Sequence, residues 1–175
     1  MTDPTNLTAM DRLSALTQDV KDIRAQMKAV AQEAVKEGAK AIFQEYGDIL
    51  HSFGWRQYTP SFNDGDPCYF TMEDPYLIAK IDTEGLEEDE IEDFADDEGS
   101  AAFGYRGKSR ATTGWGANEK PNPEYDPRYA AAEDAVGKLY TALSEGEVSK
   151  DVFGEFASVV FTPDEVRVEE CEAPY

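Results

Sequence analysis

The densest group of reactive side chains in this sequence is a run of carboxylates between Glu84 and Glu98. The run reads EGLEEDEIEDFADDE and holds ten Asp or Glu residues in fifteen positions. As a helix it would carry about one negative charge per 2.2 Å, against about one per 1.7 Å of duplex DNA axis. Such a run can replace phosphates on the basic surface of another protein. The carboxylates expected to face that partner are Glu87, Glu88, Asp89, Glu90, Glu92, Asp93, Asp96 and Asp97.

Two other interpretations of this acidic run stay open. Short acidic runs are commonly solvated loops that only add solubility. Scattered carboxylates also bind calcium, although weakly when no Gly-turn loop positions them. Ile91 and Phe94 are spaced to anchor one side of a short helix, which favours an ordered run.

The sequence offers few groups for catalysis or metal binding. His51 is the only histidine, and it follows a long predicted helix, where a structural role is the usual one. A zinc site of the Cys/His type needs four ligands, more than His51, Cys68 and Cys171 supply. The 37 carboxylates could form a pair for glycoside hydrolysis, but no spacing selects one. We therefore predict a protein that is not an enzyme, with no catalytic residue, no cofactor and no bound metal.

A phosphate-binding loop is the nucleotide motif that the sequence approaches most nearly. Gly107-Lys108-Ser109 matches the end of that loop, but the glycine required five residues earlier is replaced by Ala102. Acidic residues also stand where an apolar strand should precede the loop. Residues 99–127 are instead predicted to form a Gly/Pro-rich segment that is an irregular loop or an edge strand. Its cations, which would neutralise part of the acidic run, are Arg106, Lys108 and Arg110.

Charge divides the chain into two parts. The 175 residues include 16 basic and 37 acidic side chains, for a net charge of −21. Residues 1–50 hold 6 basic and 8 acidic side chains, whereas residues 51–175 hold 10 and 29. A chain of this charge is repelled by nucleic acid and by anionic membranes, so neither is expected as a direct partner. No bilayer-spanning apolar run or secretory leader pattern is present, and two distant cysteines suit a reducing cytoplasm.

An apolar seam at heptad spacing runs along the N-terminal third. Residues from Thr8 to Leu50 contain no proline and two glycines, which predicts one long helix. Such a helix would be about 63 Å long and should protrude from a domain of this size. Spacings of three and four alternate along the seam, which is the a/d pattern of a coiled coil. The seam residues are Leu13, Leu16, Val20, Ile23, Met27 and Val30.

Two roles fit this helix. The narrow a/d stripe favours self-association through residues 10–34, with a dimer preferred, and in a parallel pair Asp19 would face Arg24 of the partner. The alternative is an amphipathic helix that folds back on its own core and is broken near Gly38. The broader apolar stripe from Ala34 to Leu50 is expected to lie on the rest of the domain.

The segment after the helix predicts a β-hairpin. Trp55–Phe62 and Cys68–Met72 are rich in aromatic and β-favouring residues, and the Asn63-Asp64-Gly65-Asp66 sequence between them is a turn signal. Tyr76–Ile81 is a predicted third strand. Oxygens of the turn could also ligate calcium, but the bidentate Glu and further alternating ligands of that signature are absent, so a simple turn is the better interpretation.

The same hairpin carries a resemblance to known sequences. The string WRQYTPSFNDGDPCYF, residues 55–70, resembles a WxQYTPxFNDGDPCxF-like motif of small, uncharacterised acidic proteins of phage and bacterial genomes. Val166–Glu170 also resembles the closing strand of that group. The resemblance implies a shared hairpin core and a bacterial or phage setting. It assigns no activity and no site residue.

The C-terminal part predicts two more helices and a second hairpin. The helices are expected at 128–144 and 150–157, and the hairpin strands at 159–161 and 166–168. The predicted fold class is therefore α+β: a long, coiled-coil-like N-terminal helix, then a small antiparallel sheet with one or two packed helices.

Together these patterns favour an acidic interaction protein made of two parts. Residues 1–50 would form an oligomerisation helix, and residues 51–175 an acidic α+β domain. The expected function is to block the basic nucleic-acid-binding surface of a host protein, as a bacteriophage DNA mimic or anti-defence inhibitor acting in the bacterial cytoplasm. The alternative is an oligomeric structural or assembly accessory protein whose acidic surface only solubilises it.

Overall fold

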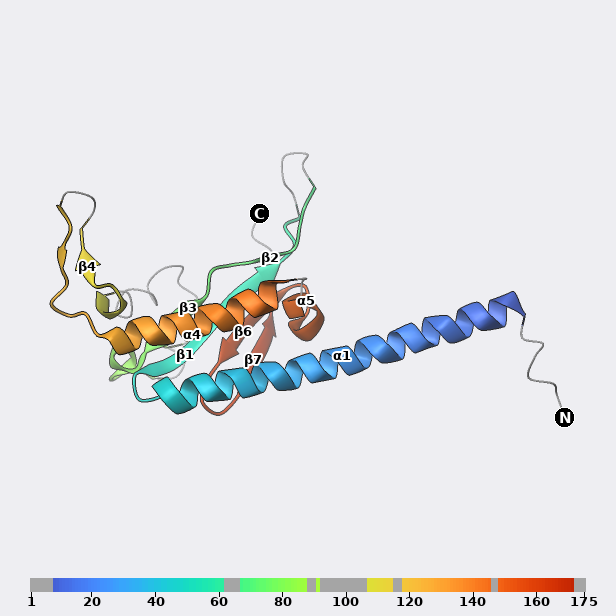
Figure 1. Cartoon of the computed structure of the whole chain (residues 1–175), viewed down its shortest axis with the longest axis horizontal. Helices are drawn as coiled ribbons and strands as arrows, with labels where there is room; N and C mark the ends of the chain where they lie inside the picture. Colours follow the sequence, from blue (N-terminus) through green and yellow to red (C-terminus); the bar gives the residue numbers. More distant parts are fainter. Residues whose placement is uncertain are drawn as a thin grey trace.

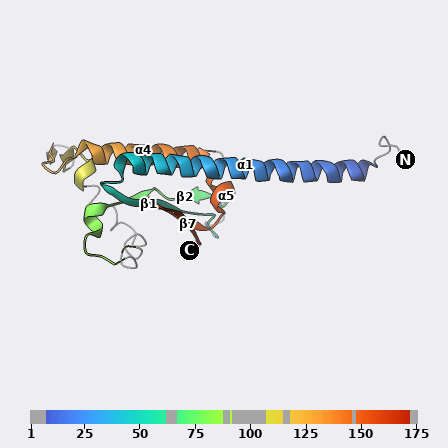
Figure 2. The same cartoon turned by 90° about the horizontal axis from the view of Figure 1, so that it is seen from below.

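The protein has a layer of helices packed on one face of a small sheet, with one helix extending far beyond both (Figures 1 and 2). The computed structural model describes residues 8–61, 67–87, 91, 107–114, 118–145 and 148–171. The predicted α+β class is confirmed. In chain order the elements are α1 (Ala9–Tyr46), β1 (Leu50–Tyr58), β2 (Thr71–Met72), β3 (Tyr76–Ala79), the 3₁₀ helix η1 (Lys80–Thr83), β4 (Thr112–Thr113), β5 (Lys120–Pro121), α4 (Pro127–Ser144), α5 (Val148–Phe153), β6 (Ala157–Phe161) and β7 (Val166–Glu170).

The long helix α1 begins at a strong start signal and runs without a break. The backbone N–H of Asp11 donates to the Thr8 hydroxyl, and the Asp11 carboxylate accepts from the Thr8 N–H, which forms a capping box. Its 38 residues give a length of about 57 Å. The break near Gly38, which belonged to the alternative of a folded-back helix, is absent. The helix also ends before the predicted Leu50, because Leu50 belongs to β1 and pairs with Ala79 of β3.

The strand β1 is the centre of the sheet. It pairs antiparallel with β6 along one edge and with both β2 and β3 along the other, and β7 closes the sheet beyond β6. The predicted hairpin is present, but its paired part is short, with Tyr58 opposite Thr71 and Gln57 opposite Met72. Gly54 cannot be replaced by a larger residue, because a Cβ there would collide with the carbonyl oxygen of Val159. The predicted turn at residues 63–66 lies outside the described residues.

An aromatic stack joins the sheet to α1. Phe53 of β1 stacks on Phe43 of α1 with ring centroids 5.4 Å apart, and on Phe161 of β6 at 4.8 Å. The Trp55 ring lies 5.2 Å from that of Phe161. Buried residues of the last three turns of α1 join the same core, which matches the broad stripe predicted there. These residues are Val35, Ala39, Ile42 and Phe43.

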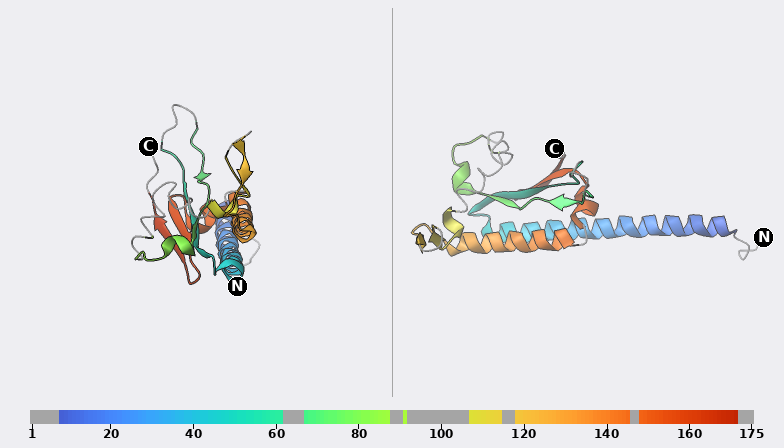
Figure 3. Two further views of the ribbon diagram at one scale, coloured as in Figure 1. Left: turned by 90° about the vertical axis from the view of Figure 1, so that its left-hand side faces the viewer. Right: turned by 90° about the horizontal axis from the view of Figure 1, so that it is seen from above.

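Helix α4 lies beside α1 and runs antiparallel to it (Figure 3). At one end, Arg128 makes two hydrogen bonds to the Asp48 carboxylate, of 2.6 and 2.7 Å. Further along, a Cβ at Gly38 would meet Leu139 of α4 at 3.3 Å. The N-cap residue Asp126 and the following Pro127 start α4 one residue before the predicted position.

The C-terminal elements follow the prediction with shifted ends. The second predicted helix, 150–157, is present as α5, which ends at Phe153. Gly154 follows with φ of 107°, a conformation that suits glycine and stops the helix. The chain must leave the helix there because Ala157 already pairs with Gln57 of β1. Strands β6 and β7 form the predicted closing hairpin.

A buried glutamine ties α5 to the sheet. Gln57 is fully buried, and its amide oxygen accepts from the Trp55 indole N–H at 3.0 Å and from the Ser149 hydroxyl. Its amide N–H groups donate to the carbonyl oxygens of Ser149, at 3.2 Å, and of Gly154. Every hydrogen-bonding group of this side chain is therefore used, which a buried amide requires.

Replacing Gln57 by leucine should therefore destabilise the protein strongly. The Gln57→Leu change leaves the Trp55 indole and the Ser149 hydroxyl buried without an acceptor, so we expect a loss of about 3 kcal/mol in the free energy of unfolding. Chemical denaturation, monitored by circular dichroism, measures the free energy of unfolding. Gln44→Leu, at an exposed position of α1, is the matched control and should change stability by less than about 0.5 kcal/mol. Equal stabilities for the two variants would contradict the role given to Gln57.

Candidate interaction surfaces

The apolar seam of α1 is exposed along its whole length. Every residue from Thr8 to Val30 is exposed, and Figure 1 shows this segment extending away from the rest of the molecule. The exposed fractions of the six seam residues range from 48% at Val20 to 70% at Val30. The alternative in which this stripe folds back on the protein's own core is therefore wrong, and the seam stays available as a contact surface.

The seam and the core-facing side of α1 point in different directions. A helix turns by about 100° per residue, so the buried Val35, Ala39 and Ile42 lie about a third of a turn away from the seam. Ala34 and Ala41, which continue the seam's heptad positions into the packed half, are exposed. The seam is thus a separate apolar face and not the exposed end of the core stripe.

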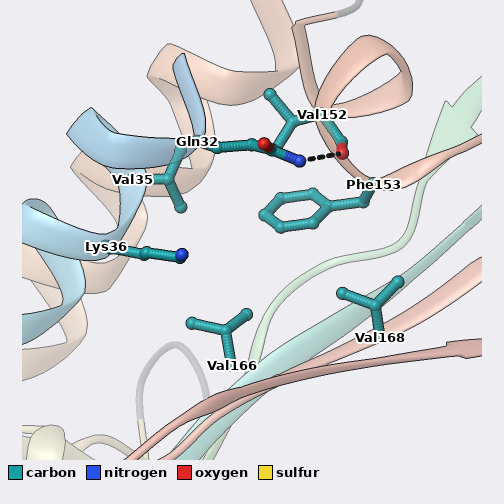
Figure 4. Close-up of a pocket in the computed structure, with 7 residues that line it drawn as sticks. All are labelled: Gln32, Val35, Lys36, Val152, Phe153, Val166 and Val168. Carbon is teal, nitrogen blue, oxygen red and sulfur yellow. Dashed lines mark hydrogen bonds between the residues drawn. The ribbon is translucent and has the colours of Figure 1, made fainter. Parts of the chain in front are cut away.

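A pocket of about 320 Å³ lies where α1 leaves the rest of the molecule (Figure 4). Gln32 donates from its side-chain amide to the Val152 carbonyl oxygen at 3.3 Å, which fixes α1 against α5. Lys36 is the one ionisable side chain among the described lining residues, which include no carboxylate, hydroxyl, thiol or imidazole, so they do not form a catalytic pair. The pocket is lined by Gln32, Val35, Lys36, Val152, Phe153, Val166 and Val168.

Residues 84–87 and Ile91 are the described part of the acidic run. Glu84 and Glu87 are exposed, and Ile91 is half-buried, as its predicted anchoring role requires. The Ile91 N–H donates to the Glu87 carbonyl oxygen at 3.1 Å. Of the predicted partner-binding residues, those outside the described part are Glu88, Asp89, Glu90, Glu92, Asp93, Asp96 and Asp97.

The basic cluster packs against the molecule's own side chains. The Lys108 ammonium lies 5.7 Å from the centre of the Tyr129 ring. Ser109 is buried, and Asn122 donates to the carbonyl oxygens of Gly107 and Arg110. Gly107-Lys108-Ser109 forms a helical turn, and not the irregular loop or edge strand predicted there. These contacts pack the turn against the rest of the molecule and give no support to a phosphate site. Arg106 lies outside the described residues.

His51 has a structural position. It is half-buried at the start of β1, with Nδ1 3.1 Å from the Ser52 hydroxyl. Within the described ranges, no group of three or more His, Cys, Asp or Glu side chains could hold a metal ion. In the same ranges, no helix is both long and apolar enough to cross a membrane.

Side chains of the aromatic hairpin motif hold α5 in place. Trp55, Gln57 and Thr59 alternate along the chain, and the Thr59 hydroxyl donates to Glu155 at 2.5 Å. Lys150 of α5 pairs with the same carboxylate at 2.9 Å. The Thr59 hydrogen bond, and then Lys150, lower the pKa of Glu155. Sequence reasoning missed these contacts, although the alternation of Trp55, Gln57 and Thr59 was visible in the sequence.

Comparison with known proteins adds no relative: no protein-family model, no curated protein and no solved structure matches the chain.

Asp82 is the carboxylate whose burial has a measurable consequence. Burial raises its pKa, opposed by a hydrogen bond from Ala79 and by the Lys108 charge. Its Oδ2 atom is buried and has no hydrogen-bond partner in the part of the chain that the structure describes. A carboxyl with a raised pKa in the folded state costs stability once it ionises, so the cost appears as pH rises through that pKa.

We therefore expect Asp82→Asn to raise the thermal midpoint at pH 7 by about 2 °C and to have no effect near pH 3, where the carboxyl is protonated in both states. Thermal scans by circular dichroism at the two pH values measure this. The exposed Asp164→Asn is the control and should leave the midpoint unchanged at pH 7. A lower midpoint for Asp82→Asn at pH 7 would show that ionised Asp82 stabilises the fold.

Proposed function

We propose that this chain is a non-enzymatic interaction protein that dimerises through the seam of α1 and uses its acidic domain to occupy a basic, nucleic-acid-binding surface of a host protein. It would act in the bacterial cytoplasm and be encoded by a phage. The observation that carries the proposal is the division of the chain into an exposed apolar helix and a strongly acidic domain.

Exposed apolar area favours self-association through the seam. Fully burying a side chain of this type contributes about 1.5–3 kcal/mol, and each seam side chain is about half exposed or more. Covering the seams of two chains would therefore contribute about 10–20 kcal/mol. Association costs about 4–15 kcal/mol in lost freedom, a range that the gain overlaps and exceeds at its upper end.

The charge of residues 51–175 supports the choice of partner. With 10 basic against 29 acidic side chains, this part of the protein attracts cationic surfaces and repels nucleic acid. Exposed carboxylates on described elements add to the net negative charge without belonging to the acidic run. They include Glu133, Glu145, Glu169 and Glu170.

The alternative function is that of an oligomeric structural or assembly accessory protein. The exposed seam favours it as strongly, because self-association alone would serve that role. The two functions differ in what the acidic surface does: mimicry needs a basic partner that competes with DNA, and an accessory role does not.

Two charges placed in the seam should dissociate the dimer into single chains. In Leu16→Asp with Ile23→Asp, carboxylates would have to be buried between the helices at a cost of several kcal/mol. Light scattering should give twice 19.4 kDa for the natural chain and 19.4 kDa for the variant. Gln18→Asp with Ala25→Asp is the matched control, since it adds the same charges seven residues apart on the opposite face. A natural chain with the mass of one molecule would remove the self-association proposal.

The acidic run should capture a basic protein in a salt-dependent way. In a pull-down from bacterial lysate, we expect a basic nucleic-acid-binding protein to be retained at about 100 mM salt, released at about 500 mM and displaced by duplex DNA. Changing Glu87, Glu88, Glu90 and Glu92 to Gln should abolish the capture.

The control for net charge changes Glu133, Glu145, Glu169 and Glu170 to Gln and should retain capture. Equal loss in both variants would mean that total charge, and not the run, attracts the partner. Recovery of no basic nucleic-acid-binding protein at about 100 mM salt would favour the accessory role.

A further inference from the structure

No described element of the chain covers the seam of α1, and we propose that the seam of a second copy covers it in the antiparallel direction. This inference rests on the self-association proposed above and adds the direction and register of the pair. It also fixes where the two acidic domains of a dimer lie.

The spacing of the seam permits this direction. Counted from either end, the six residues follow spacings of three, four, three, four and three, so the pattern is the same when the helix is reversed. An antiparallel pair centred between Val20 and Ile23 therefore places every seam residue opposite an apolar one. The three distinct contacts, each made twice, are Leu13 with the partner's Val30, Leu16 with the partner's Met27, and Val20 with the partner's Ile23.

Charges beside the seam fit either direction about equally. In the antiparallel register Arg12 lies opposite the partner's Glu33, twice in each dimer. A parallel pair would instead bring Asp19 opposite the partner's Arg24, also twice. Exposed ion pairs of this kind contribute little, so they do not decide the direction.

The repulsion between the two acidic domains decides the direction of the pair. In a parallel pair the two domains, with 10 basic and 29 acidic side chains each, would lie side by side at the same end of the helices. In the antiparallel pair, Val35 of one chain is level with the start of the partner's helix, which separates the two domains by about 40 Å along the axis. That distance is several times the screening length of about 8–10 Å, so the repulsion is removed.

The fold already contains a helix that lies on α1 in this direction. α4 runs antiparallel to α1, with Arg128 near Asp48 and Leu139 near Gly38, and it ends at Ser144 (Figure 3). The partner's helix would begin at about the level along α1 where α4 ends.

Cross-linking tests the direction. In a background of Cys68→Ser and Cys171→Ser, we would make Leu13→Cys and Val30→Cys separately, each with a tag of different size, and treat them with a short bismaleimide. Antiparallel pairing predicts a cross-linked dimer mainly when the two variants are mixed. Parallel pairing predicts cross-links within each variant alone. Ala25→Cys, on the opposite face of the helix, is the control and should not react with itself.

Each outcome has one meaning. Cross-links confined to the mixture support the proposal, and cross-links within each variant alone overturn the antiparallel direction while leaving the dimer intact. A dimer by light scattering that gives no cross-link in any combination overturns the register. A single-chain mass for the natural protein overturns both the proposed dimer and its direction.

Charge exchange gives a second measurement. Arg12→Glu should weaken the dimer about 2- to 10-fold, and adding Glu33→Arg should restore it. The two positions are about 32 Å apart on one helix, so only a contact between chains can couple them. Asp19→Arg is the control. It should weaken only a parallel dimer, in which adding Arg24→Asp would restore binding, and that result would overturn the proposal.

Discussion

The hydrogen bonds of the Gln57 amide fix the arrangement of the helices. The amide is fully buried on β1, and its partners lie on the same strand, in α5 and in the turn after α5. A buried amide that loses such partners is costly, so α5 is held at one end of the sheet. Because α5 also accepts the Gln32 hydrogen bond, the place where α1 leaves the protein is set by the same network.

This constraint separates two apolar surfaces that lie on a single helix. Beyond Gln32 the body of the molecule ends, and the stripe from Leu13 to Val30 has no side chain of the described chain against it. The packed half of α1 instead uses a different side of the helix, about a third of a turn away. One helix thus serves the core with its last turns and offers a contact surface with its first ones. Residues 51–175 carry 19 of the 21 units of net negative charge.

Features set by neighbouring residues were predictable from the sequence, and features set by distant pairing were not. The Thr8–Asp11 start of α1 and the seam follow from local spacing. The ends of α1 and α5 do not, because Leu50 pairs with Ala79 and Ala157 with Gln57. Gln57 itself looks like a surface residue in the sequence, and only its partners in α5 make it part of the core. Of the predicted acidic site, Glu87 alone is described, so that prediction stays a prediction.

The capping box at Thr8 links the shape of the protein to its concentration. A helix of about twenty residues without tertiary support is marginal in water, and its start signal is then its main local source of order. If a second chain supplies the missing support, folding of this segment and association share one free energy. Dilution would then unfold the first turns of α1 and leave the sheet intact. The helix content would therefore fall as the protein concentration falls.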